Sequence, residues 1–251
     1  RSGALEVATK PAPGDRPAEA TLRQAIRRLA GVRVVRHPGL PSTSLGATAA
    51  VEPPLWHGPR PLVLGVGASA GGPSAIVEIV AAFDPRQTPA VVVAQHLPRG
   101  QSEGFARFLA ERCRLEVVLC KGTTSLGPGR LVLPDDGLHL VVLDAERAAV
   151  TEPDAGTLLV PNVDLLFTSL AMRVGAAAVG AVLTGIGHDG AVGLAALRDA
   201  GALTLAQDEA SSAVYGMPRA AASAARFRLP PREMARMITG AFERPLATRR
   251  A

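Results

Sequence analysis

The sequence has no apolar segment long enough to cross a membrane, and it has few cysteines. No apolar run reaches the roughly 18 residues that a membrane-spanning helix needs, and the first residues lack the apolar core of a signal peptide. The two cysteines, Cys113 and Cys120, could form one disulfide at most, and reduced, buried cysteines are the simpler interpretation. These absences argue against membrane insertion and against a disulfide-rich secreted domain. We therefore expect a cytoplasmic protein.

Aromatic residues are also scarce, at 3% of 251 residues, and the positive charge is confined to the flanks. Residues 1–60 hold nine Lys/Arg against four Asp/Glu, and residues 231–251 hold five against two. Residues 61–230 hold thirteen against sixteen. A slightly acidic centre with few aromatic rings lacks both the basic surface and the stacking groups that nucleic-acid binding uses. We therefore expect no nucleic-acid partner.

The chain divides by pattern into three parts. Residues 1–30 end in a predicted amphipathic helix over 17–30, with Leu22 and Ile26 on its apolar face. Residues 31–60 are rich in proline, which is typical of an extended linker. From residue 61 to 251, where apolar runs alternate with helical patterns, we expect the main domain.

The main domain is predicted to be α/β, because continuous apolar strands that alternate with helices form parallel sheets covered on both faces. Short, closely spaced strands between residues 116 and 152 indicate an antiparallel hairpin insertion. The expected fold is a doubly wound, mostly parallel sheet, in which ligands bind at the carboxyl ends of the strands. The predicted strands are 62–66, 90–94, 178–183, 202–206 and 226–229, and the predicted helices are 73–82, 102–112, 163–174, 190–200, 216–225 and 231–242.

The first strand of this domain ends in Gly65-Val-Gly-Ala-Ser69-Ala-Gly-Gly-Pro73. The spacing fits a dinucleotide-binding turn, but the acidic residue that should follow about 20 positions later is missing, since the second strand ends in Gln95-His96. It also fits a nucleophile elbow, in which small residues allow a sharp turn to expose a serine. A glycine-rich turn without chemistry is a third interpretation. The motif alone leaves all three open.

Two further polar residues follow strands that should end at the same edge of the sheet. His96 ends the second strand, and Asp189 follows the strand at 178–183 in a glycine-rich loop. A histidine on the neighbouring strand can act as the base for Ser69, and an aspartate can orient its ring. Asp189 could equally be an ordinary N-cap of the helix after it. Their convergence favours a Ser69, His96 and Asp189 triad.

These residues lie in four stretches that resemble the catalytic domain of the chemotaxis protein-glutamate methylesterases, the CheB family, over residues 61–242. The resemblance implies that Ser69 is the nucleophile, His96 the base and Asp189 its partner, with the backbone amide of Ile186 as an oxyanion donor. It implies methyl esters of chemoreceptor glutamates as substrate, with glutamine deamidation as a second reaction, and neither a metal nor an organic cofactor. The family usually has Thr where this sequence has Ala70. The matching stretches are Gly67-Ala-Ser-Ala-Gly-Gly72, Gln95-His-Leu-Pro98, Leu183-Thr-Gly-Ile-Gly-His-Asp-Gly190, and Ala206-Gln-Asp-Glu-Ala-Ser-Ser212 with Tyr215-Gly-Met-Pro218.

The first 30 residues resemble the end of a response-regulator receiver domain, through Gly3–Pro11 and the helix that follows. This segment would supply only the last strand and helix of such a domain, without the phosphoacceptor aspartate. A histidine kinase would be a partner if the natural protein carries a complete receiver domain.

Two other functions stay open from the sequence. A serine esterase or amidase of the same fold could act on another substrate, although the order Ser, His, Asp differs from the usual Ser, Asp, His order of α/β-hydrolases. A non-catalytic nucleotide-binding module is the other alternative. Among the nearby polar residues, we interpret His188 as a loop residue, His139 as a surface or strand residue, and Ser211 and Ser212 as part of a turn.

Overall fold

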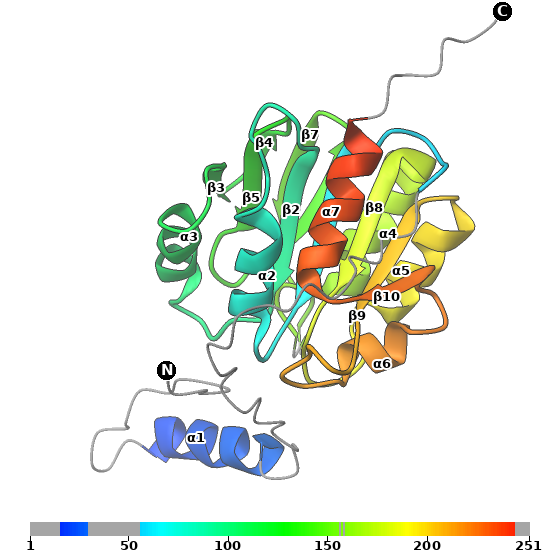
Figure 1. The fold of residues 1–251 in the computed structure, drawn as a ribbon. Coiled ribbons are helices and arrows are strands. Elements are labelled where there is room, and N and C mark those ends of the chain that lie inside the picture. Colours follow the sequence, from blue (N-terminus) through cyan, green and yellow to red (C-terminus); the bar gives the residue numbers. More distant parts are fainter. Residues whose placement is uncertain (1–15, 30–55, 156, 158, 244–251) are drawn as a thin grey trace, which may run out of the picture. The chain divides into compact units, whose positions relative to one another are not determined.

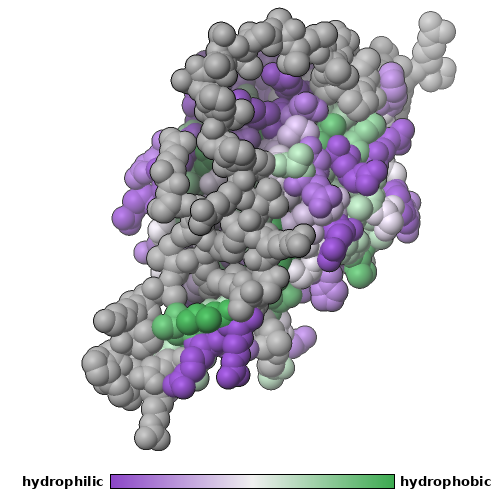
Figure 2. All heavy atoms as spheres, turned by 60° about the horizontal axis from the view of Figure 1, so that its bottom comes forward, coloured by the Kyte–Doolittle hydropathy of each residue, from purple (hydrophilic) through white to green (hydrophobic). Residues whose placement is uncertain are grey.

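The computed structural model describes residues 16–29, 56–155, 157 and 159–243 of the chain, which forms two compact units, residues 1–48 and 49–251. In the first unit, α1 (Arg16–Leu29) confirms the predicted helix. Figure 2 shows hydrophobic side chains of α1 beside strongly hydrophilic ones, as an amphipathic helix requires. The strand predicted before this helix and the linker up to residue 55 lie outside the described residues.

The second unit is built on a seven-stranded sheet in which every neighbouring pair of strands is parallel. The strand order is β10-β9-β8-β1-β2-β5-β3, so the chain winds away from β1 in one direction and later returns on its other side. The crevice at such a reversal is where doubly wound sheets bind ligands. The strands are β1 (Val63–Ala68), β2 (Ala90–Gln95), β3 (Glu116–Cys120), β5 (Arg130–Pro134), β8 (Ala178–Val182), β9 (Leu203–Gln207) and β10 (Phe227–Leu229).

Helices cover both faces of this sheet, as predicted (Figure 1). Side chains alternate between the faces along each strand, so that Leu64 and Val66 join the core under α2, α3 and α7, whereas Val63 joins the core under α4, α5 and α6. The helices are α2 (Gly72–Val80), α3 (Ser102–Ala110), α4 (Val163–Arg173), α5 (Ala191–Asp199), α6 (Met217–Ala221) and α7 (Pro231–Phe242), with a short 3-10 helix η1 (Gly175–Ala177).

Two glycines of β1 let α4 approach the sheet closely. A Cβ atom on Gly65 would lie 2.4 Å from a methyl group of Leu170, and a Cβ atom on Gly67 would lie 2.1 Å from a methyl group of Val163. A side chain at either position would have to displace the α4 side chain that packs there. The start of α4 is therefore held beside the carboxyl end of β1.

The antiparallel insertion is confirmed, but it is smaller than predicted. It consists of β4 (Thr123–Ser125), β7 (Arg147–Thr151) and β6 (His139–Asp144), which form a separate three-stranded sheet. The prediction that all strands of 116–152 belong to it was wrong, because β3 and β5 pair in parallel and extend the main sheet beside β2. Short apolar runs of similar length do not show which strand they pair with.

Residues 56–60, which we placed in the linker, pack on the second unit. The Trp56 side chain is only 5% exposed and belongs to the core. Its ring nitrogen donates a hydrogen bond to the Pro59 carbonyl oxygen at 3.0 Å, and the Arg226 guanidinium lies 5.1 Å from the ring centroid. The folded unit therefore includes this end of the proline-rich segment.

We expect Trp56→Ala to lower the free energy of unfolding by about 3 kcal/mol, because truncation of a buried aromatic residue leaves a cavity. The measurement is urea denaturation followed by far-ultraviolet circular dichroism, since Trp56 is the only tryptophan and its fluorescence is lost in the variant. The control is Leu62→Ala, two residues beyond this segment, where the side chain is exposed and the expected loss is within about 0.5 kcal/mol. Equal small losses would show that Trp56 is not part of the core.

Candidate active site

Ser69 lies directly after β1, in the turn that leads into α2. Gly71 ends this turn with φ +80°, in the left-handed region that favours glycine, and a Cβ atom there would lie 2.6 Å from the Cβ of Ala213. On the neighbouring strand, Gln95 is the register partner of Ala68, and the His96 amide donates to the Ala68 carbonyl at 3.0 Å. Ser69 and His96 therefore follow paired positions on adjacent strands.

The Gln95 side chain joins the two strand ends. Its Nε2 donates to the backbone carbonyl of Ser69 at 2.8 Å and to that of His96 at 3.0 Å. The side chain is buried, and its Oε1 has no hydrogen-bond partner within the described chain. The sequence does not predict this bridging role, although Gln95 stands out as a polar residue at the end of an otherwise apolar strand.

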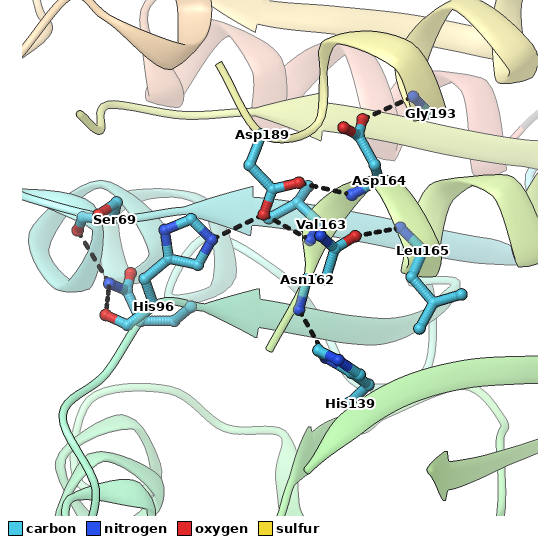
Figure 3. A network of polar contacts seen from close by, with 10 residues as sticks. Ser69, His96, His139, Asn162, Val163, Asp164, Leu165, Asp189 and Gly193 are labelled. Carbon is cyan, nitrogen blue, oxygen red and sulfur yellow. Dashed lines mark hydrogen bonds and ion pairs between the residues drawn. The ribbon is translucent and has the colours of Figure 1, made fainter. Parts of the chain in front are cut away.

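His96 and Asp189 are brought into contact. The ring Nε2 of His96 lies 2.8 Å from Oδ2 of Asp189, and Ser69 lies on the other side of the ring in the view of Figure 3. The remaining ring nitrogen, Nδ1, is the one left to accept a proton from the serine. The Ser69 hydroxyl makes no hydrogen bond to the described residues, as is common for catalytic groups before substrate binds.

The carboxylate of Asp189 is also bound by the first amides of α4. The amide of Val163 donates to Oδ2 at 2.8 Å and that of Asp164 donates to Oδ1 at 2.9 Å. The interpretation of Asp189 as an N-cap of its own helix was wrong: the N-cap of α5 is Gly190, at φ +92°, without a side-chain hydrogen bond. Asp189 instead accepts hydrogen bonds from the start of α4. This contact cannot be seen in the sequence, because Asp189 is 25 and 26 residues away from the two donors. The α4 residue at the N-cap, Asn162, accepts from the Leu165 amide at 2.6 Å.

Asp164, in the first turn of α4, in turn accepts a hydrogen bond from the start of α5. Its Oδ1 accepts a hydrogen bond from the Gly193 amide at 2.7 Å, in the first turn of α5. A Cβ atom on Gly193 would lie 2.6 Å from the Cβ of Phe167, so the two helices approach closely at this point. Each of the two helices is therefore capped by an aspartate from the other segment (Figure 3).

The two carboxyl groups have opposite pKa shifts. Burial acts to raise the pKa of Asp189, but the hydrogen bonds from His96 and from the Val163 and Asp164 amides outweigh burial and lower it. Burial raises the pKa of Asp164, and the nearby charge of Asp189 adds to the rise, although the amides of α5 oppose it. Asp189 is therefore the carboxylate that stays ionised beside the imidazole.

Of the two alternatives for His139, a surface residue or a strand residue, the second holds: His139 begins β6 and is buried. Its Nδ1 accepts a hydrogen bond from the Asn162 amide at 3.0 Å, which makes it a support for the start of α4. Burial lowers the pKa of His139, while the charges of Asp189 and Asp154 oppose that effect. The neutral ring keeps its acceptor nitrogen.

The loop after β8 packs against the serine turn. The Ser69 amide donates to the Thr184 carbonyl at 3.0 Å, and the Thr184 hydroxyl donates to the Ala70 carbonyl at 2.9 Å. A Cβ atom on Gly185 would lie 2.8 Å from the Cβ of Ser69. The next amide along the loop, that of Ile186, has no hydrogen-bond acceptor within the described residues, and neither has that of Ala70. The residue after Ser69 and the residue after Gly185 therefore each have an unused amide donor within the described chain.

The other polar residues that we singled out take structural positions. His188 is exposed in the loop before α5. Ser212 is buried, and its hydroxyl donates to the Asp208 carbonyl at 2.7 Å, while Ser211 bonds the Asp208 side chain, as a turn requires. Within the described ranges, no group of three or more His, Cys, Asp or Glu side chains could hold a metal ion. None of the helices in those ranges is long and apolar enough to cross a membrane.

A nucleophile beside a base whose ring is oriented by a carboxylate is the arrangement of a serine hydrolase. The family model described as CheB methylesterase matches residues 64–238. The chain belongs to the CheB methylesterase family. The resemblance seen in the four sequence motifs is thereby confirmed.

Relatives of this CheB-family chain include "Protein-glutamate methylesterase/protein-glutamine glutaminase 3" of Myxococcus xanthus, which is 43% identical over 183 residues. A similarly named protein, number 2 of Anaeromyxobacter dehalogenans, is 38% identical over 222 residues. The alignments cover 72% and 87% of this chain, but only 51% and 63% of the relatives. The chain thus spans between half and two thirds of the length of these proteins.

The fold has a solved counterpart in the CheB methylesterase catalytic domain of Thermotoga maritima. The TM-score is 0.67 at 23% sequence identity, and the match covers 72% of this chain and 98% of the other. The doubly wound sheet of this CheB-family chain is therefore the fold of that catalytic domain.

The buried imidazole of His139 makes the stability of the CheB-family chain depend on pH. Because its pKa is lowered from 6.5 in the folded chain, the unfolded chain binds a proton at higher pH. The stability contributed by neutral His139 is complete above pH 6.5 and is lost as the pH falls through the lowered pKa. We expect the Tm measured by calorimetry to fall over this range. Asp189, with a pKa below its ordinary 3.8, adds a loss only at more acidic pH.

The control for this prediction is His139→Asn, which keeps an acceptor for the Asn162 amide but does not titrate. Its Tm should fall less over the same range. The raised pKa of Asp164 has the opposite sign, since it favours the folded state on the acidic side. Asp164 is present in both proteins, so their difference isolates His139. Parallel pH profiles would contradict the prediction.

Proposed function

We propose that this chain is a serine hydrolase that removes methyl esters from glutamate side chains of bacterial chemoreceptors. The observation that carries the proposal is the 2.8 Å contact between His96 and Asp189 at the carboxyl edge of the sheet, with Ser69 across the ring. A base held in this way can activate a serine hydroxyl. The residue types and their placement support acyl transfer.

In the first half of the proposed reaction, His96 accepts the Ser69 proton at Nδ1 as the serine oxygen attacks the ester carbonyl carbon. Asp189 accepts from Nε2–H throughout and stabilises the imidazolium that forms. The negative charge that develops on the carbonyl oxygen is stabilised by the amides of Ile186 and Ala70, which have no acceptor in the described chain. The imidazolium then protonates the departing methoxide, which leaves as methanol.

In the second half, water attacks the glutamyl–Ser69 ester with His96 again acting as base. The products are a glutamate carboxylate and the free serine. The same steps with a primary amide release ammonia, so we include glutamine deamidation as a second reaction of this site. Protein side chains, backbone amides and water supply all the groups that these steps need, and the proposal involves no metal or organic cofactor.

The relatives support the proposed substrates, because they are named for two activities, protein-glutamate methylesterase and protein-glutamine glutaminase. Methylated chemoreceptors are accordingly the proposed partners. A histidine kinase is a further proposed partner if the natural protein carries a complete receiver domain.

We expect Ser69→Ala to abolish methanol release from membranes that contain methylated chemoreceptors. Loss of a triad nucleophile typically lowers kcat on the order of 10⁶-fold. The fold should be kept, because the hydroxyl makes no hydrogen bond within the described chain, and circular dichroism with a Tm measurement checks this. Activity of Ser69→Ala within tenfold of the wild type would remove the serine from the mechanism.

Asp189→Asn should lower kcat by roughly 10⁴-fold, because an amide can donate to Nε2 and leave the proton on Nδ1, the wrong tautomer for a base. His188→Ala is the matched change at the adjacent position. His188 is exposed, and we expect less than about a tenfold effect there. Methanol release measured for both variants decides the assignment. If His188→Ala lost most of its kcat while Asp189→Asn kept it, His188 and not Asp189 would be the partner of the catalytic base.

A further inference from the structure

The carboxylate of Asp164 takes no part in the acyl-transfer steps, yet it lies on the far side of Asp189 from His96 (Figure 3). Its Oδ1 accepts from the Gly193 amide at 2.7 Å, and its own amide donates to Asp189 Oδ1 at 2.9 Å. Two hydrogen bonds thus join the starts of α4 and α5 in opposite directions.

These two bonds connect Asp189, Asp164 and Gly193, so that the start of α4 and the start of α5 hold each other beside Asp189. The N-cap of α5 is Gly190, which has no side chain to satisfy the first amides of that helix. Asp164 supplies the missing acceptor from α4. Because Gly190 follows Asp189 directly, the bond that fixes the start of α5 also fixes the backbone that carries the Asp189 carboxylate.

We propose that Asp164 is a positioning residue, which holds the Asp189 carboxylate in contact with His96 by fixing the start of α5. The inference rests on the proposed function, because it concerns the geometry of the same site. Asp164 acts through Asp189 and touches neither the substrate nor the reacting atoms.

The surrounding charges explain why a carboxylate suits this position. The titratable groups that interact with the two aspartates are His96, His139 and the aspartates themselves. The amides of Gly193, Gly190 and Val192 all favour the ionised form of Asp164. An asparagine offers one acceptor oxygen and would turn its NH₂ group toward the other amides. It should therefore replace the carboxylate only in part.

The test compares Asp164→Ala and Asp164→Asn with the wild-type chain in two measurements. The first is kcat and KM for methanol release from methylated receptor membranes. The second is the NMR chemical shift of the His96 ring Nε2–H proton, which hydrogen-bonds Asp189, assigned with a His96→Gln variant. We expect Asp164→Ala to lower kcat about tenfold with KM within about twofold, since small misplacements of catalytic groups are costly. The His96 Nε2–H resonance should move upfield, because a loosely held Asp189 makes a longer and weaker hydrogen bond. Asp164→Asn should give values between those of the wild type and Asp164→Ala.

Ser169→Ala is the matched control, because it removes a bond of the same kind from the same helix. The Ser169 hydroxyl oxygen accepts from the Val142 amide at 2.9 Å and links α4 to β6, away from Asp189. This variant should lower the Tm without changing kcat or the His96 Nε2–H resonance. An effect of helix stability alone would be the same for the Asp164 and Ser169 variants.

The proposal is overturned if both Asp164 variants keep the wild-type kcat and His96 Nε2–H resonance while their Tm falls as in Ser169→Ala. Asp164 would then be a helix cap alone. If Asp164→Ala does not fold, Asp164→Asn decides by the same two measurements. A wild-type chain that releases no methanol would contradict the proposed function, whereas the His96 Nε2–H resonance would still test the role of Asp164.

Discussion

The carboxylate of Asp189 accepts hydrogen bonds from the His96 ring and from the first two amides of α4. Burial alone would favour its neutral form, but these three donors favour the charged form. A charged acceptor selects the imidazole tautomer with the proton on Nε2 and leaves Nδ1 as a base. The chemistry of the site therefore depends on amides that come from a helix with no reacting group of its own.

The position of those amides depends on the sheet. Helix α4 can bring its first turn to the carboxyl end of β1 because Gly65 and Gly67 present no side chains to it. Gly193 allows the same close approach between α4 and α5. The His96 ring is thus oriented by backbone groups on rigid elements, which hold a geometry better than flexible loops do. A larger residue at Gly193 would meet the backbone of Asp164 itself, with its carbonyl oxygen 2.8 Å from the added Cβ atom.

The fold class, and the edge of the sheet at which the three residues of the proposed triad lie, could be predicted because each has a local signal. Ser69, His96 and Asp189 each follow an apolar run, and parallel strands bring their carboxyl ends to one edge. The supports of the site have no such signal. In the sequence, Asp164 is an acidic residue in the first turn of a helix and His139 is a residue in a strand. Their roles appear only when the fold brings Asp164 to α5 and His139 to Asn162.

The sequence places Trp56 in a linker because prolines surround it. Its partner Arg226 is distant in the sequence, so only the folded structure shows that Trp56 packs on the domain. The pairing of β3 with β5 likewise depends on the tertiary structure, because the sequence offers several short strands of similar pattern as partners.

The strand order also accounts for which ring nitrogen meets which partner. In the most familiar Ser-His-Asp enzymes, Nδ1 of the histidine faces the aspartate and Nε2 faces the serine, whereas here Nε2 faces Asp189. Ser69 follows β1, which lies between β2 and β8 in the sheet; His96 follows β2, and the loop after β8 carries Asp189. The His96 ring lies between Ser69 and Asp189 in the view of Figure 3. Nε2, the ring nitrogen farther from the backbone, contacts the aspartate from the more distant strand, and Nδ1, the nitrogen nearer the backbone, is left for the serine of the adjacent strand. The reversed ring therefore fits a serine that follows the strand next to that of the histidine and an aspartate that comes from the strand beyond it.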